Sequence, residues 1–185
     1  MGAAGVAGVV KMRADALLAL SRTTKVRAVA GERVQNLLTL EVEYEPSRVP
    51  GHRFAGARLT EEVGAVATGM GVYQLDPGNG SWPYHFEAAE EEWLIVVAGE
   101  VTLRAPDGES VLRAGDVVCF PAGAAGAHAV RNHTDAPARF AMPSTNGRVG
   151  GATIYPDGGK VNVYTRGFRH RGRLGEQVEY WEGEP

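Results

Sequence analysis

From about residue 38 onward, the chain consists of brief apolar runs separated by Gly, Pro and Asp. Between residues 38 and 45 apolar side chains alternate with polar ones, which is the period of a strand with one buried face. Further runs lie at 72–75, 93–97, 101–104, 110–112, 117–120, 127–130, 139–142 and 153–155. Brief strands divided by turn residues at such short intervals are typical of a sandwich or barrel. We therefore predict an all-β fold.

The first thirty or so residues have a different character. Residues 13–20 are rich in Ala and Leu, which favours a short helix, and the period-two pattern is missing before residue 38. We therefore expect residues 1–32 to form an extension that is partly helical or disordered. Residues 33–185 are expected to form one β-barrel domain, because a chain of 185 residues can bury a substantial core.

Composition narrows the choice of partners. The chain has 19 Lys and Arg against 22 Asp and Glu, so there is no broad basic field for nucleic acid. No segment reaches the length that crosses a membrane, so we expect no membrane partner either. The single cysteine, Cys119, cannot form an internal disulfide, which fits a cytoplasmic protein. We expect Cys119 to be buried in the apolar run at 117–120. A local group of arginines is interpreted as a solvated loop rather than a phosphate or substrate site: Arg166, Arg169, Arg171 and Arg173.

Two stretches about forty residues apart carry residues suited to metal binding. His85 and Glu87 are two positions apart, so on a strand both side chains point to one face and can reach one ion. Glu92 begins an apolar run, where a carboxylate on the core side is costly unless it is paired or bound to a metal. His128 lies in a second apolar run and is enclosed in the same way. Imidazole and carboxylate ligands together suit one divalent ion such as Zn, Mn, Fe or Ni.

Taken singly, a buried His is usually a hydrogen-bonded core residue, and an acidic run is usually a solvated loop. The joint spacing is more informative: H-x-E-x4-E-x6-G ends at Gly99, and G-x5-P-x-G-x4-H-x3-N ends at Asn132. These two patterns resemble the two motifs of the cupin superfamily, and the chain is most similar to bacterial single-domain cupins of the cupin_2 type. The resemblance implies a double-stranded β-helix, or jelly-roll barrel. It also implies one divalent metal ion bound by four residues: His85, Glu87, Glu92 and His128.

Glu87 stands where the superfamily usually has a second His. One alternative is that Glu87 is the fourth ligand, which its position beside His85 favours. The other is that Glu87 acts as a catalytic general base next to the metal. His85, Glu92 and His128 would then form a two-His-one-carboxylate site with open positions.

The resemblance implies an enzyme that acts on a small organic substrate, by isomerase-type, lyase-type or dioxygenase chemistry, and the fold alone does not choose among these. The alternative is a non-catalytic cupin module that binds a metal or a small ligand. We also expect a homodimer, in which Tyr180 and Trp181 cover a sheet edge or a partner chain.

Several other residues are given ordinary structural interpretations. Asn132 is interpreted as a hydrogen-bonding turn residue and Glu91 as a surface residue. We expect core or dimer contacts for Tyr84, Trp93 and Phe120, and surface positions for His52, His133 and His170.

Overall fold

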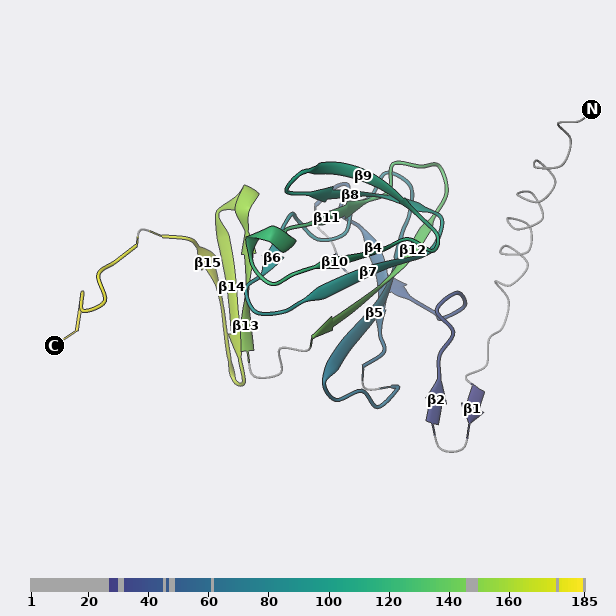
Figure 1. Cartoon of the computed structure of the whole chain (residues 1–185), viewed down its shortest axis with the longest axis horizontal. Helices are drawn as coiled ribbons and strands as arrows, with labels where there is room; N and C mark the ends of the chain where they lie inside the picture. Colours follow the sequence, from purple (N-terminus) through teal and green to yellow (C-terminus); the bar gives the residue numbers. More distant parts are fainter. Residues whose placement is uncertain are drawn as a thin grey trace, which may run out of the picture.

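The described part of the protein is almost entirely β-structure (Figure 1). The computed structural model describes residues 27–29, 32–44, 46, 49–60, 62–145, 150–175 and 177–184. Its helical segments are two single 3-10 turns, η1 (Ala124–Gly126) and η2 (Pro156–Gly158). No helix in these ranges is long and apolar enough to cross a membrane. The all-β prediction is therefore confirmed.

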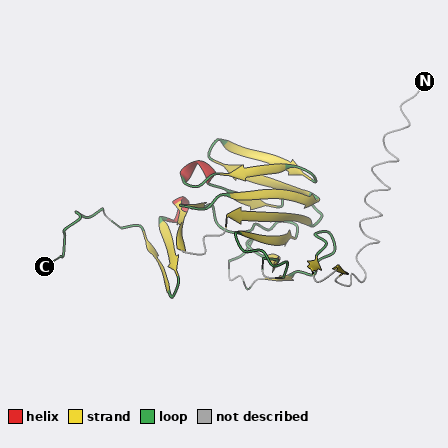
Figure 2. Cartoon of the chain, turned by 60° about the horizontal axis from the view of Figure 1, so that its bottom comes forward, coloured by secondary structure: helices red, strands yellow, loops and turns green. Residues whose placement is uncertain are grey.

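Two antiparallel sheets form the body of the fold, and their strands lie one above another across the view in Figure 2. The larger has the strand order β10-β7-β12-β5-β4-β3 and the smaller has the order β11-β8-β9. The strands of the larger sheet are β3 (Glu43–Tyr44), β4 (Phe54–Arg58), β5 (Thr68–Leu75), β7 (Glu92–Ala98), β10 (Val117–Phe120) and β12 (Ala138–Thr145). Those of the smaller are β8 (Glu100–Ala105), β9 (Gly108–Arg113) and β11 (Ala129–Arg131).

A third sheet stands beside these layers and has the order β15-β14-β13-β6 (Figure 1). Its strands are β6 (Phe86–Glu87), β13 (Gly150–Tyr155), β14 (Lys160–Thr165) and β15 (Phe168–Arg173). The sequence analysis predicted part of β13 but neither β14 nor β15. The interpretation of the arginine group as a loop is wrong for three of its members, because Arg169, Arg171 and Arg173 lie on β15.

The main core lies between the larger and the smaller sheet. Period-two alternation along β7 and β8 turns Leu94, Val96, Val101 and Leu103 inward, where they meet Phe140 of β12. Burying each of these side chains stabilises the fold by roughly 1.5–3 kcal/mol. The same layer holds Phe120, Val130 and Met142, so the core extends up to the strands that carry the candidate ligands.

The segment before β3 covers the outer face of the larger sheet. We predicted a strand over residues 38–45, but of the described residues 38–44 only Glu43 and Tyr44 pair in a sheet, and residues 37–39 form a turn. Leu37 and Leu40 pack against the sheet there, over Val72. Arg139 holds the turn, because its Nη1 donates hydrogen bonds of 3.1, 2.9 and 3.0 Å to the carbonyls of residues 37, 38 and 40. The predicted buried face is therefore wrong at Leu38 and Tyr44, which are exposed, and holds only in part at Leu40 and Val42, which are half-buried.

Two further expectations concern β10 and the N-terminal extension. Cys119 is exposed rather than buried, because β10 is an edge strand whose Val117 and Cys119 point outward while Phe120 points into the core. Of the extension, residues 1–26, 30 and 31 lie outside the described residues. Arg27–Val29 pairs with Glu32–Val34 as a two-stranded hairpin, β1 and β2. The domain boundary at residue 32 stays a prediction.

Candidate metal centre

Two histidines from distant parts of the sequence are joined by their backbones. His85 precedes β6 and His128 precedes β11, and the two residues exchange N–H···O bonds of 3.1 and 2.8 Å in an isolated antiparallel bridge. The turn before His128 is tight, since a Cβ on Gly126 would clash with the carbonyl oxygen of Pro121. Phe120 stacks on the His128 ring at a centroid distance of 3.8 Å. Gly126, Pro121 and Phe120 therefore fix the direction of this imidazole.

Hydrogen bonds also select the tautomer of both rings. His85 Nδ1 lies 2.8 Å from the Pro83 carbonyl oxygen, and His128 Nδ1 lies 2.9 Å from that of Gly126. A carbonyl oxygen only accepts, so each neutral ring carries its proton on Nδ1 and leaves the lone pair on Nε2. This is the arrangement in which a metal-binding histidine is oriented by a backbone carbonyl. Both imidazoles therefore present a free Nε2.

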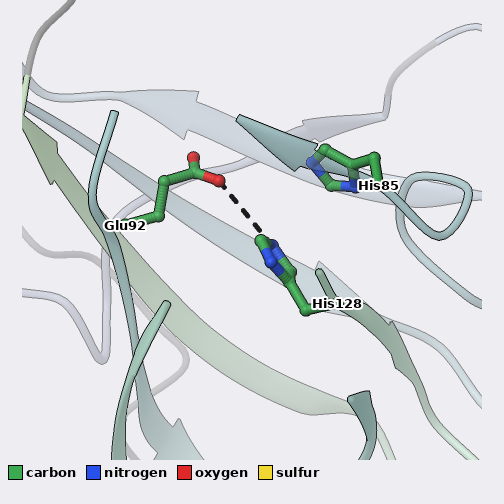
Figure 3. A group of neighbouring side chains, drawn as sticks. All are labelled: His85, Glu92 and His128. Carbon is green, nitrogen blue, oxygen red and sulfur yellow. Dashed lines mark ion pairs between the residues drawn. The ribbon is translucent and has the colours of Figure 1, made fainter. Parts of the chain in front are cut away.

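Glu92 begins β7 and brings its carboxylate to the two rings (Figure 3). Its Oε2 lies 3.7 Å from His128 Nε2, which is too long for a hydrogen bond. Both atoms are buried, and neither has a hydrogen-bond partner among the described residues. A buried polar atom without a partner costs about 1–3 kcal/mol. A cation between the two atoms would satisfy both.

The ligand atoms of His85, Glu92 and His128 all lie within 4.8 Å of one another. Ligand atoms bound to one ion at about 2.0–2.2 Å lie about 3–4 Å apart, so the group has to contract by only about an ångström. Two neutral imidazole nitrogens and one carboxylate oxygen form a set that suits Zn, Mn, Fe or Ni. The residues present therefore fit a divalent ion.

Burial disfavours the charged forms of the metal-free ligands. Desolvation, followed by the charges of Glu87 and Glu90, raises the pKa of Glu92 to about 7. Desolvation, followed by the neighbouring His85, lowers the pKa of His128 to about 4. The contact drawn in Figure 3 is thus not an ion pair at neutral pH, because His128 is not protonated there. A bound dication would reverse the cost at Glu92 by favouring the carboxylate.

Glu87 lies beside this group but is not part of it. Thr153 donates a hydrogen bond to the Glu87 carboxylate, with Oγ1 2.9 and 3.1 Å from its two oxygens. The Tyr164 hydroxyl lies 3.3 Å from Glu87 Oε2 and 2.6 Å from Glu90 Oε1, so its single proton goes preferentially to Glu90. Desolvation is the largest cause that raises the pKa of Glu87. Of the two sequence-based alternatives, this position favours a base next to the metal, and ligation by Glu87 stays a prediction.

A cavity of about 1180 Å³ opens onto His85, Glu87 and Glu92. Tyr73, Trp82 and Tyr155 form aromatic parts of its wall, and Tyr155 stacks on the His85 ring at a centroid distance of 5.8 Å. Sequence reasoning missed these wall residues, because an isolated aromatic residue near a turn carries no signal of its partners. Glu90 also lines the cavity and accepts a hydrogen bond from Tyr164.

The remaining sequence predictions have mixed outcomes. Asn132 is fully buried and donates to the carbonyls of Leu75 and Ala136, as expected for a hydrogen-bonding residue. Phe120 is a core residue, and Trp93 is exposed with a hydrogen bond to Glu91. Surface positions are confirmed for Glu91, His133 and His170, whereas His52 is half-buried with Nδ1 3.0 Å from the Ser81 carbonyl oxygen. Tyr180 and Trp181 are 84% and 75% exposed, so they cover no sheet edge formed by the described residues.

Comparisons with known proteins agree with the geometry. The family model described as "Cupin domain" matches residues 71–143, a range that contains all three converging ligands. A proposed sugar phosphate isomerase from Acidithiobacillus ferrooxidans superposes with a TM-score of 0.68 at 25% identity, over 76% of this chain and 90% of that chain. A sugar phosphate isomerase of the cupin superfamily from Silicibacter pomeroyi superposes with a TM-score of 0.66 at 25% identity, over 78% of this chain and 96% of that chain. A search of curated proteins finds no match.

The fold and the site together define a jelly-roll β-barrel with a candidate mononuclear metal centre near its core. The chain has the fold of the cupin superfamily, and its residues 71–143 match the cupin domain model.

Proposed function

We propose that the protein is a metal-dependent enzyme that isomerises a small hydroxy-carbonyl compound. In this proposal His85, Glu92 and His128 hold the ion, and Glu87 is the general base. The observation that carries it is the position of Glu87, whose carboxylate lines the same cavity as His85 and Glu92 without joining the ligand group. A carboxylate placed in this way is free to move a proton rather than to bind the ion.

The surroundings of Glu87 suit proton transfer. Thr153 orients the carboxylate through hydrogen bonds to both oxygens. Burial raises the pKa of Glu87 above that of an exposed carboxyl. Its pKa is thus closer to neutral pH, where a group accepts and returns a proton efficiently. Glu87 is thus oriented and poised by residues of β13 and β14.

A divalent ion bound by the three ligands would polarise a carbonyl oxygen and so acidify the carbon next to it. Glu87 removes the proton from that carbon and returns one to the former carbonyl carbon, while the hydroxyl proton passes to the former carbonyl oxygen, so the carbonyl and hydroxyl groups exchange places. The atoms of substrate and product balance, and no co-reactant is needed. The cavity of about 1180 Å³ is ample for a small substrate.

The two solved structures with TM-scores of 0.68 and 0.66 support isomerisation over lyase or dioxygenase chemistry. One is named a sugar phosphate isomerase and the other a proposed one, and each is matched over at least 90% of its own length.

Hydrogen–deuterium exchange tests this proposal. Metal-loaded protein is incubated in D₂O with a panel of aldose and ketose phosphates and the corresponding free sugars, and deuterium at the carbon next to the carbonyl is followed by NMR. We expect exchange with wild type, at least about a hundredfold less with Glu87→Gln at unchanged metal content, and none with His128→Ala. Glu91→Gln is the matched control, because Glu91 is exposed and its bond to Trp93 needs only an acceptor. Bound metal without exchange on any member of the panel would instead support a non-catalytic metal-binding cupin.

A further inference from the structure

The same cavity has a second wall, made of arginines. Arg166, Arg169 and Arg171 line it on the side of the β14–β15 hairpin, and Arg58 lines it from β4. The acidic residues of the cavity are Glu62, Glu87, Glu90 and Glu92. Glu92 is a candidate metal ligand, Glu87 is the proposed base, and Glu90 lies next to them. A cationic wall therefore shares one cavity with the proposed reaction centre.

Strand register ties this wall to Glu87. Glu87 of β6 pairs with Thr153 of β13, Thr153 pairs with Asn162 of β14, and Asn162 pairs with Arg171 of β15. Residues paired across a sheet share a face, so these four side chains form one row on the cavity side. Adjacent strands lie about 4.8 Å apart, which places the backbones of Glu87 and Arg171 about 14 Å from each other. Arg169 is on the same face, opposite Tyr164.

The arginines of the β14–β15 hairpin are left without a carboxylate partner among the described residues. No ion pair joins Arg166, Arg169 or Arg171 to a carboxylate of the described residues. Two arginines of β8 and β9, by contrast, are paired: Arg104 with Asp157 and Arg113 with Glu100. A guanidinium carries several N–H donors in a planar fork that matches a phosphate group. The three cavity arginines are therefore available for an anionic ligand.

Asn162 supplies an independent observation in the middle of the row. Its side chain is only 8% exposed and lines the cavity, and its Oδ1 has no hydrogen-bond partner among the described residues. An unpartnered buried acceptor is costly unless a ligand satisfies it. A ligand hydroxyl could donate a hydrogen bond to Asn162 Oδ1. Asn162 lies between Thr153 and Arg171 in the sheet, so that hydroxyl would lie between the two ends of the row.

We propose that Arg169 and Arg171, assisted by Arg166, bind a phosphate group of the substrate while its carbonyl end lies at Glu87 and the metal centre. Asn162 Oδ1 accepts a hydrogen bond from a hydroxyl between the two ends. The substrate class is thus a phosphorylated polyhydroxy-carbonyl compound, and the hairpin of β14 and β15 is the specificity element. The part of this proposal that concerns the carbonyl end rests on the proposed function; the part that concerns the anion does not.

Binding of inorganic phosphate to the metal-loaded protein tests the anion site directly, by isothermal titration calorimetry. We expect wild type to bind phosphate, and the double variant Arg169→Gln/Arg171→Gln to bind it at least about tenfold more weakly. Arg173→Gln is the matched control, because Arg173 lies on the same strand but does not line the cavity. Equal phosphate affinity of wild type and double variant would overturn the proposal, as would equal weakening by Arg173→Gln. Binding that is lost with His128→Ala but kept in the double variant places the anion at the metal and also overturns it.

A second measurement separates this proposal from the proposed function. If wild type isomerises a sugar phosphate, the double variant should raise KM for that substrate at least tenfold and leave kcat/KM for the free sugar unchanged. An equal loss for both substrates would contradict a phosphate role. If wild type isomerises nothing but binds phosphate through Arg169 and Arg171, the isomerase proposal fails and the anion site stands.

Discussion

The protonation of the metal-free ligands predicts a distinctive pH dependence of metal binding. A divalent ion needs a Glu92 carboxylate and neutral imidazoles. Burial raises the pKa of Glu92 to about 7, so below that pH the ion must displace a proton from Glu92, and affinity is lost as the pH falls through 7. Burial lowers the pKa of His128 to about 4, so the ion displaces no proton from His128 until the solution is far more acidic. Burial lowers the pKa of His85 as well.

The magnitude follows from displacement of one proton. Apparent affinity should fall about tenfold per pH unit below about pH 7, or about a hundredfold between about pH 8 and about pH 5. A site with a Glu and two His of ordinary pKa would instead lose more than about a thousandfold over that range, because both imidazoles would have to lose protons.

Competition with a chelator of known pH dependence measures the slope, with Mn²⁺ or Zn²⁺ as the probe. Glu92→Gln should bind more weakly and show almost no slope between about pH 5 and about pH 7, since its amide has no proton to lose. A wild-type slope near two protons per ion in this interval would refute the assignment of buried, neutral histidines. A flat wild-type profile would refute the raised pKa of Glu92.

Three further predictions concern stability and assembly. Metal-free Glu92→Gln should be more stable than metal-free wild type by about 3 kcal/mol at about pH 8 and no more stable at about pH 4. The reason is that the raised pKa of Glu92 makes the wild-type native state lose stability as the pH rises toward 7. Urea unfolding of both proteins at both pH values checks the sign. Arg139→Met should destabilise the fold by about 2–3 kcal/mol, because three carbonyls of the turn at 37–40 lose their donor, and the exposed Arg113→Met should change stability much less in the same assay. We also propose a homodimer that buries the exposed Tyr180 and Trp181, so light scattering should give a dimer mass that drops on deletion of 178–185; a monomer mass for the full chain would contradict this.

Periodicity and turn residues were sufficient to predict most strands of the barrel. The predicted run at 117–120 coincides with β10, and the run at 93–97 lies inside β7. Periodicity and turn residues failed where the conformation or burial of a residue depends on a part of the chain that is distant in sequence. Leu40 alternates like a strand residue because it packs on the outer face of the larger sheet, yet Arg139 holds its backbone in a turn. Cys119 sits in an apolar run but on the outward face of an edge strand.

The candidate site also has a part that the sequence predicted, the metal ligands, and a part that it did not, the cavity wall. The resemblance of the two motifs to those of cupins predicted that His85, Glu87, Glu92 and His128 would surround one ion. The structure brings three of them together, His85, Glu92 and His128. The cavity wall was not predictable, because β13, β14 and β15 reach Glu87 only through long-range strand pairing. The basic residues of β15 therefore looked like a solvated loop in the sequence, although the register aligns Arg171 with Glu87 across the sheet.

The central claim is that His85, Glu92 and His128 hold one divalent ion with Glu87 beside it. Elemental analysis of tag-free protein, wild type and variants, tests this most directly. We predict about one ion per chain for wild type and for Glu87→Gln, and nearly none for His128→Ala, with His170→Ala as the exposed-histidine control that keeps its metal. A full complement of metal in His128→Ala would contradict the claim outright. Loss of metal in Glu87→Gln equal to that in His128→Ala would show that Glu87 is a ligand and not the free base.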